Sequence, residues 1–188
     1  GLLLAGPGAR SVEPRARLIH NIGQHGQVDQ VALVADPAVE HDVELGIAQA
    51  QGGRLRRELE VGTGCGYQAA VLSHVASEVY SIERLRGLHE RARVNLRAFR
   101  LAHVHLLFGD GMAGFPQGAP YAGIIAAAGG EAVPATWTDQ LAEGGRIVAP
   151  TVMPHRQQAL VVIEKKAGRL SQTVLESVHF VPLKSGIA

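Results

Sequence analysis

Residues 58–67, with the sequence ELEVGTGCGY, place three glycines at alternate positions directly after a short apolar run. Glycine adopts positive φ without strain and lets the backbone approach a ligand closely, and a following helix offers free N–H groups at its start. A carboxylate, Glu60, stands two residues ahead of the first glycine. The spacing therefore predicts a ligand-binding turn between a strand and a helix. The residues expected to form this turn are Gly62, Thr63, Gly64 and Gly66.

The spacing of the glycines argues against two common nucleotide-binding loops. A phosphate loop of the Walker type requires a Lys after its last glycine, and none follows here. A dinucleotide fingerprint requires its third glycine at position 67, where Tyr67 would obstruct close helix packing around a pyrophosphate. Cys65 at a helix start could be a reactive thiol, but a small spacer between two glycines is the simpler interpretation. A carboxylate beside such a turn suits a ligand with a cationic amine, such as an amino-acid moiety.

Two further carboxylates end the next two expected strands. Glu83 lies 21 residues after Gly62, where its oxygens can accept from both hydroxyls of a ribose. Asp110 lies in the run FGDG, placed to accept from an exocyclic adenine amine, while the Gly111 backbone can approach the ring. Each acid alone could equally be a solvated loop residue or a helix cap. Together with Glu60 they predict a site for adenosine joined to an amino acid, and S-adenosylmethionine is that molecule.

Alternating strands and helices must position these side chains. Strands are expected at residues 56–61, 78–83, 104–110, 122–128, 146–152, 158–165 and 170–183, and helices at 67–76, 84–99 and 133–145. The repeated β-then-α order predicts an α/β fold, with a doubly wound, mainly parallel sheet and an antiparallel C-terminal strand pair. The buried stripe of the second helix is expected to consist of Leu85, Leu88, Ala92, Leu96 and Phe99.

The third expected helix precedes the fifth strand. Gly144 and Gly145 are expected to end it, and Trp137, four residues after Val133, is expected to be a packing residue on this helix. Glu131, just after the fourth strand, is a candidate to face the substrate.

The first 53 residues differ in amino-acid composition from the rest of the chain. They are rich in Gly, Pro, Gln and His, and a helix is expected from about Val39 to Ala50, ended by Gly52 and Gly53. The predicted organisation is an atypical N-terminal segment, residues 1–53, followed by a cofactor-binding domain, residues 54–188.

Composition narrows the class of protein. Lys and Arg number 18 against 17 Asp and Glu, so the net charge gives no reason to expect nucleic acid or an anionic membrane as a partner. The single cysteine excludes an internal disulfide and fits a cytoplasmic setting. His103 and His105 share a strand face but lack an evident third ligand, so no metal site is expected. We expect a monomer.

The runs LEVGTGCGYQAAVLSHVASEVYSIER, FGDGMAGFP and HFVPL together resemble the protein-L-isoaspartate O-methyltransferases. The resemblance covers roughly residues 57–186. It implies a Rossmann-like class I methyltransferase fold, and transfer of a methyl group from S-adenosylmethionine to the α-carboxylate of L-isoaspartyl residues in proteins or peptides. The methyl ester favours closure to a succinimide and so begins repair. A carboxylate is nucleophilic without a base and a sulfonium leaves readily, so positioning can supply much of the catalysis and no catalytic residue is assigned.

This chain departs from the family pattern upstream of the glycine turn. The family carries an H-G-Q-T-I-S-Q-P segment whose hydroxyls help to hold the substrate carboxylate, whereas residues 25–30 read HGQVDQ. Asp29 would repel a carboxylate substrate. Ala122 replaces the acid of the family's P-Y-D. Two alternatives therefore stay open: a methyltransferase for another nucleophile, and a non-catalytic descendant that binds cofactor or a partner.

Overall fold

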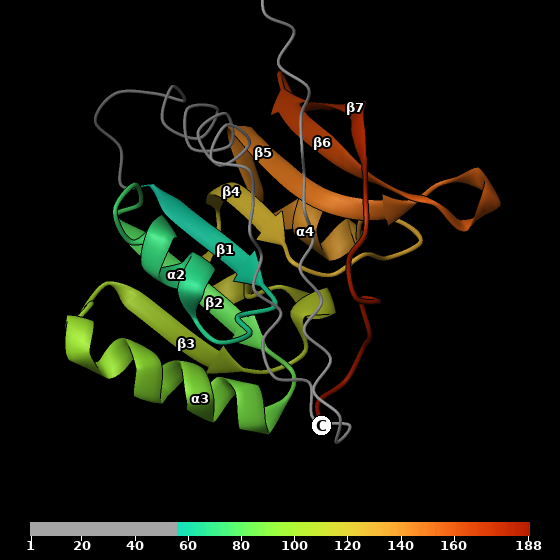
Figure 1. The fold of residues 1–188 in the computed structure, drawn as a ribbon. Helices are drawn as coiled ribbons and strands as arrows, with labels where there is room; N and C mark the ends of the chain where they lie inside the picture. The colour runs from blue at the N-terminus through green and yellow to red at the C-terminus, as the bar shows by residue number, and fades with distance from the viewer. Residues whose placement is uncertain (1–55) are drawn as a thin grey trace, which may run out of the picture. The chain divides into compact units, whose positions relative to one another are not determined.

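A computed structural model describes residues 56–188 of the chain (Figure 1). The predictions for the N-terminal segment, including the helix from Val39 to Ala50 and the HGQVDQ departure, lie outside the described residues.

The described residues form a seven-stranded sheet with the order β3-β2-β1-β4-β5-β6-β7. Its strands are β1 (Arg57–Val61), β2 (Glu78–Glu83), β3 (Val104–Phe108), β4 (Tyr121–Ala126), β5 (Leu141–Val152), β6 (Gln158–Lys166) and β7 (Arg169–Val178). The pairs from β3 to β5 are parallel, and the pairs β5·β6 and β6·β7 are antiparallel. The predicted mainly parallel sheet with an antiparallel C-terminal strand pair is confirmed.

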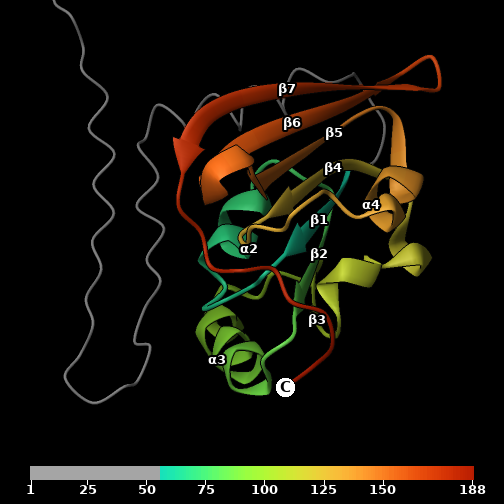
Figure 2. The same ribbon diagram turned by 90° about the vertical axis from the view of Figure 1, so that its right-hand side faces the viewer.

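Helices cover both faces of this sheet. They are α2 (Tyr67–Leu72), α3 (Arg86–Leu96) and α4 (Ala135–Gln140), with 3-10 turns η1 (Arg97–Phe99), η2 (Gly111–Ala113), η3 (Pro116–Gly118) and η4 (Pro154–Arg156). Seen along the sheet, α2 and α3 lie on one side and α4 on the other, as a doubly wound fold requires (Figure 2). No helix in residues 56–188 is long and apolar enough to cross a membrane.

The chain reverses its direction across the sheet next to β1. From β1 it proceeds to β2 and then β3 on one side, and it returns to β4 on the other side of β1. In open α/β sheets such a switch point leaves a crevice outside the carboxyl ends of the strands, where ligands bind. The carboxyl end of β1 is the start of the glycine turn, so the topology places the turn at the crevice.

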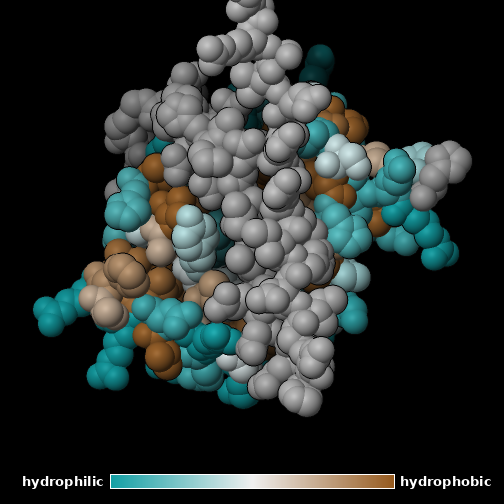
Figure 3. All heavy atoms as spheres, in the orientation of Figure 1, coloured by the Kyte–Doolittle hydropathy of each residue, from teal (hydrophilic) through white to brown (hydrophobic). Residues whose placement is uncertain are grey.

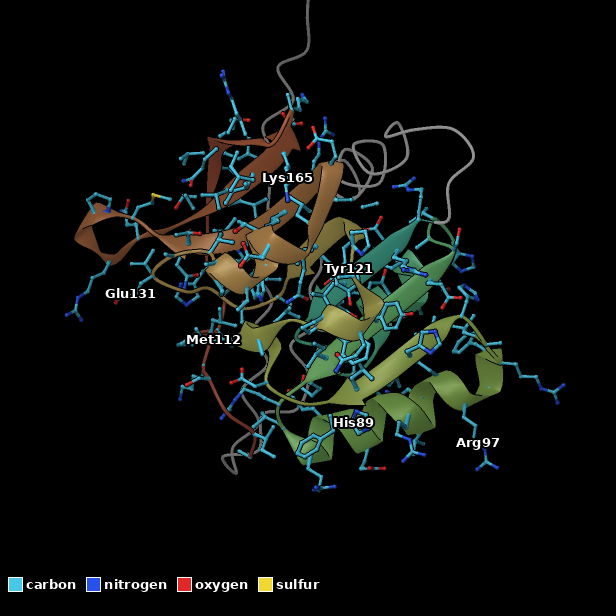
Figure 4. All side chains as sticks on the ribbon, turned by 180° about the vertical axis from the view of Figure 1, so that it is seen from behind. His89, Arg97, Met112, Tyr121, Glu131 and Lys165 are labelled. Carbon is cyan, nitrogen blue, oxygen red and sulfur yellow. The ribbon has the colours of Figure 1, made fainter. Side chains whose placement is uncertain are left out.

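The sheet-facing stripe of α3 differs in part from the expected one. Ala92 and Leu96 are buried as predicted, but Leu85 and Phe99 are 37% and 66% exposed. The helix ends at Leu96 and the chain tightens into η1, which turns Phe99 outward. His89 is buried instead, between α3 and β3, while Arg97 points away from the sheet (Figure 4).

The outer face of α3 is charged. Hydrophilic side chains project at the lower left of Figure 3, where Figure 1 shows α3. Its exposed charged residues are Arg86, Glu90, Arg91 and Arg93.

The prediction that α4 extends to Gly144 and Gly145 is wrong. The helix ends at Gln140, and β5 begins at Leu141, which pairs with Tyr121. Leu141 is 2% exposed and belongs to the core. Burial of this side chain therefore favours a strand that begins at Leu141 over a longer helix. The register of β4 and β5 is irregular after Tyr121, and Gly144 adopts a φ of 78° there. The two glycines therefore lie in the irregular first part of β5 and not at a helix end.

Candidate functional site

The turn between β1 and α2 is closed by backbone bonds. Gly62, Gly64 and Gly66 have φ values of 98°, 57° and 92°, so the predicted need for positive φ is met at all three positions. The Gly62 amide donates to the Ile82 carbonyl at 2.9 Å, and the Gly66 amide donates to the Thr63 carbonyl at 2.9 Å. The turn is therefore tied to β2 on one side and folded on itself on the other.

Glu60 lies at the base of this turn and is fully buried. Ser81 on β2, its register partner, donates to Glu60 Oε2 at 2.5 Å. Within residues 56–188, Glu60 Oε1 is buried without a hydrogen-bond partner. Burial raises the pKa of Glu60 to about 8, with the Ser81 bond opposing this and the charge of Glu83 adding to it. An unsatisfied buried carboxyl oxygen is costly, and a cationic donor would satisfy it.

Glu83 ends β2 and is fixed by two backbone donors. The Gly64 amide donates to its Oε2 and the Leu85 amide donates to its Oε1, both at 2.9 Å. The carboxylate thus holds the glycine turn to the start of α3. Each carboxylate oxygen has a second lone-pair site, so the side chain keeps acceptor capacity for ligand hydroxyls.

Asp110 lies two residues beyond β3 and caps the η2 turn. Its Oδ1 accepts from the Met112 amide at 2.9 Å, and its Oδ2 accepts from the Gly186 amide at 2.7 Å. Gly111 is buried, and a Cβ at this position would lie 2.4 Å from Cγ1 of Val61. Only glycine therefore fits between the end of β3 and the core.

Helix α4 holds the loop that follows Asp110. Trp137 Nε1 donates to the Gly111 carbonyl at 2.8 Å, and Thr136 Oγ1 donates to the Met112 carbonyl at 2.5 Å. Gln140 donates to the Ala113 carbonyl from its Nε2 at 2.9 Å. Trp137 is 1% exposed, which confirms it as a packing residue. Its indole N–H adds a role in fixing Gly111.

The fold brings the three carboxylates together at one edge of the sheet. Glu60, Glu83 and Asp110 lie at or just beyond the carboxyl ends of β1, β2 and β3, which are neighbours in the sheet. The backbone of the glycine turn stands among them. This edge offers an acceptor for a cation, a carboxylate with spare lone pairs, and an acid beside a close backbone approach.

The remaining candidates from the sequence, Glu131, His103 and His105, are not among the carboxylates at this sheet edge. Glu131 is exposed. His103 Nε2 bonds the Ser73 carbonyl, and His105 Nε2 lies 2.5 Å from Glu78. Across residues 56–188 there is no group of three His, Cys, Asp or Glu side chains that could hold a metal ion.

Sequence reasoning missed Ser81 and the contact of Gly186 with Asp110. Ser81 could have been found, because it is the one aliphatic hydroxyl in the strand EVYSIE and lies on the same strand face as Glu83. The Gly186 contact joins residues 76 apart in sequence, so a local sequence pattern could not predict it.

Comparison with known proteins identifies the family. The family model described as protein-L-isoaspartate (D-aspartate) O-methyltransferase matches residues 48–188. The chain belongs to this family.

Relatives within the family are similar over most of this chain. The protein-L-isoaspartate O-methyltransferase of Janthinobacterium sp. (strain Marseille) is 50% identical over 166 residues, which are 88% of this chain and 54% of that protein. The enzyme of that name from Ralstonia nicotianae is 55% identical over 144 residues, 74% of this chain and 44% of its own length. The chain thus spans about half the length of these curated relatives.

Solved structures agree on the fold. A protein-L-isoaspartate O-methyltransferase structure superposes with a TM-score of 0.71 at 29% identity, covering 81% of this chain and 49% of its own. A Plasmodium falciparum family protein, crystallised with S-adenosyl-L-homocysteine, gives a TM-score of 0.62 at 22% identity, covering 77% of this chain and 70% of its own. The Rossmann-like class I methyltransferase fold expected from the sequence is confirmed.

Proposed function

We propose that this chain transfers the methyl group of S-adenosylmethionine to the α-carboxylate of L-isoaspartyl residues in proteins and peptides. Family membership supports the reaction. The observation that carries the cofactor part is the set of carboxylates from Glu60, Glu83 and Asp110 around the positive-φ glycine turn.

The residues at the sheet edge fit this cofactor. The unpartnered Oε1 of Glu60 would accept from the ammonium of the methionine part. Glu83 would accept from the ribose hydroxyls, and Asp110 would accept from the adenine amine. The backbones of Gly111 and of the turn would line the ligand. The turn residues so assigned are Gly62, Thr63, Gly64 and Gly66.

In this reaction the residues of this chain would hold the cofactor and the substrate carboxylate in position. None of them is assigned a proton exchange with the substrate. When bound, the cofactor supplies an electrophilic methyl group. Glu60 would fix the amino-acid end of the cofactor, and the bonds that the Gly64 and Leu85 amides donate to Glu83 keep the turn and α3 in place. Orientation alone contributes several kcal/mol, on the order of 7–11 at best. No general acid or base is assigned.

A paired-peptide assay tests the substrate. Transfer of labelled methyl groups is measured to an L-isoaspartyl peptide and to its normal aspartyl twin. We expect transfer to the first only, because the two peptides place the carboxylate differently relative to the backbone. Equal transfer to both peptides contradicts the substrate assignment.

A cofactor-binding descendant without turnover is the second candidate. It is favoured by residues 28–30, which read VDQ where the family carries hydroxyl residues. Calorimetric binding of S-adenosylhomocysteine, with no methyl transfer to any carboxylate, would support this reading over the first.

We further propose residues 54–188 as the cofactor domain, because every assigned site residue lies there. We also propose a cytoplasmic monomer that acts on protein substrates, with no nucleic acid or membrane partner, from the near-balanced charge and the single cysteine. Light scattering tests the monomer.

A further inference from the structure

Three buried polar side chains form a chain of hydrogen bonds beneath the proposed cofactor site. Ser81 Oγ donates to Glu60 Oε2 at 2.5 Å. Thr63 Oγ1 lies 2.6 Å from Ser81 Oγ, and since Ser81 donates its proton to Glu60, Thr63 donates to Ser81. All three side chains are at most 4% exposed. Ser81 thus joins the base of the glycine turn to the carboxyl group of Glu60.

This arrangement leaves one oxygen of Glu60 available. Oε2 accepts from Ser81, while Oε1 has no hydrogen-bond partner among the residues that the structure describes. A carboxyl group held through one oxygen presents the other in a fixed direction. We propose that Ser81 is a positioning residue that fixes Glu60 Oε1 toward the ligand ammonium; this rests on the proposed cofactor site.

Within residues 56–188, the hydrogen-bond donor to the Glu60 carboxyl group is Ser81. The charged groups on these strands that lie near Glu60 are two carboxylates: Glu58, which shares its strand face and pairs with Arg56 at 3.5 Å, and Glu83, which ends the neighbouring strand. Of the other described elements beside β1, strand β4 carries one titratable side chain, the phenol of Tyr121, and helix α2 carries one, the phenol of Tyr67. Because Arg56 is paired with Glu58, the Ser81 bond is the contact within residues 56–188 that favours ionised Glu60, and it has a strong influence on the charge state of this group.

The test compares the pH dependence of ligand binding in Ser81→Ala and wild type. S-adenosylhomocysteine carries the ammonium, and 5′-methylthioadenosine keeps the nucleoside but lacks the amino acid. Loss of the donor disfavours ionised Glu60, so we expect affinity for S-adenosylhomocysteine to fall about tenfold at pH 7 and to recover at higher pH. Binding of 5′-methylthioadenosine should keep its wild-type pH profile.

Ser73→Ala is the matched control. Ser73 is also buried and donates to a backbone carbonyl, that of Ala70, but it lies at the end of α2. We expect no shift in its pH profile. If Ser81→Ala does not fold, Ser81→Cys keeps a weak donor of similar size and should give a smaller shift of the same sign. A uniform loss at every pH, for both ligands, overturns the role of Ser81. No binding by wild type overturns the proposed cofactor site itself.

An independent feature is the segment after β7, which crosses the carboxyl edge of the sheet. We call residues 181–188 the strap. Near β4, the Gly129 amide donates to the Val181 carbonyl and the Leu183 amide donates to the Gly129 carbonyl, both at 2.8 Å. In both ribbon views the strap descends from β7 and ends beside α3 (Figures 1 and 2).

The far part of the strap is bonded to the ends of β2 and β3. The Gly186 amide donates to Asp110 Oδ2 at 2.7 Å, and Arg84 Nε donates to the Gly186 carbonyl at 3.1 Å. The Ala188 amide donates to the Arg84 carbonyl, and the Arg86 amide to the Ala188 carbonyl, both at 2.8 Å.

These anchor points lie on either side of β1. The strand β1 stands between β4 and β2, so a segment bonded beyond both must pass across the end of β1, where the glycine turn lies. Residues 184–188 are all exposed. Segments with few buried contacts open locally at low free-energy cost. We infer that the strap is a gate, which opens to let S-adenosylmethionine enter and its product leave.

Gly186→Pro tests the gate in stopped-flow binding of S-adenosylhomocysteine. Gly186 has a φ of 74°, which proline cannot adopt, and proline lacks the N–H that Asp110 accepts. We expect association and dissociation rate constants both to rise about tenfold, as the loss of a bond to a charged group predicts. Ile187→Ala leaves the backbone bonds in place and should keep wild-type rates.

Two results would overturn the gate. Unchanged rates in Gly186→Pro mean that opening does not limit exchange. If the dissociation rate constant rises while the association rate constant is unchanged, the strap contacts the bound ligand but does not open to admit it. A wild-type chain that binds no S-adenosylhomocysteine contradicts the proposed function instead.

Discussion

At the scale of the residue, Glu60 combines burial with an unsatisfied oxygen. Its pKa of about 8 means that the carboxyl group is mostly protonated at pH 7 in the ligand-free protein. An ammonium at Oε1 would favour the ionised form. Binding of an amino-acid ligand is therefore expected to expel a proton, which a carboxylate with an ordinary pKa would not do.

Proton release on binding is measurable by calorimetry. In buffers of different ionisation enthalpy at pH 7, we expect S-adenosylhomocysteine to release about one proton per chain. Glu60→Gln should bind more weakly and release none. Release of the same amount by Glu60→Gln would assign the proton to another group.

Glu83 has both a structural and a proposed ligand role, and a conservative change separates them. Glu83→Gln keeps a carbonyl oxygen for one of the amides of Gly64 and Leu85. We expect cofactor affinity to fall by roughly 1.5–3 kcal/mol because charge-assisted bonds are lost. Glu78→Gln, on the same strand and bonded to His105, is the matched control and should bind as wild type. Unchanged affinity in Glu83→Gln would remove Glu83 from the site.

At the scale of the element, Gly66 joins the start of α2 to α3. A Cβ at Gly66 would lie 3.1 Å from Leu96 and 3.3 Å from Ala92, whereas one at Gly64 would meet no atom of residues 56–188 within 4 Å. Both residues have positive φ. Gly64→Ala therefore tests the backbone strain alone, and Gly66→Ala tests strain and packing together.

Denaturant unfolding compares these two variants. We expect Gly64→Ala to lower the free energy of unfolding by about 1–2 kcal/mol, from positive φ alone. Gly66→Ala should cost about 1–3 kcal/mol more, because α3 must move to admit the methyl group. Equal losses in the two variants would show that α3 does not pack closely on the turn.

The elements that carry the site could be predicted because their patterns are local. Buried strands followed by glycine or an acid define β1 and β2, and their bounds differ from the predicted ones by at most one residue. The end of α4 could not be predicted, because Leu141 leaves the helix for a core position set by its pairing with Tyr121. The outward turn of Phe99 and the strap contact with Asp110 likewise depend on tertiary packing.

At the scale of the whole molecule, Glu58 links the stability of the fold to pH. It is 2% exposed, and burial raises its pKa to about 7, although Arg56 opposes this. Its side chain lies over Gly123 of β4, where a Cβ would meet Oε2. The carboxyl group thus occupies space in the sheet that only a glycine partner leaves free.

The sign of the pH dependence follows from this raised pKa. Below pH 4.5 the group is protonated in both states. Between pH 4.5 and about 7 the unfolded chain loses this proton while the folded chain keeps it, so the free energy of unfolding falls as pH rises. Above about pH 7 the effect is constant, at about 3 kcal/mol. Glu60 acts with the same sign up to about pH 8.

Glu58→Gln removes this titration without removing the side chain's volume. Unfolding measured from pH 4.5 to 8 should show a flatter profile than wild type, with the variant more stable by up to about 3 kcal/mol at pH 8 and equal at pH 4.5. Glu90→Gln on the exposed face of α3 is the control and should keep the wild-type slope. A Glu58→Gln variant that is less stable at every pH would mean that the Arg56 ion pair, at 3.5 Å, outweighs the burial of the carboxylate.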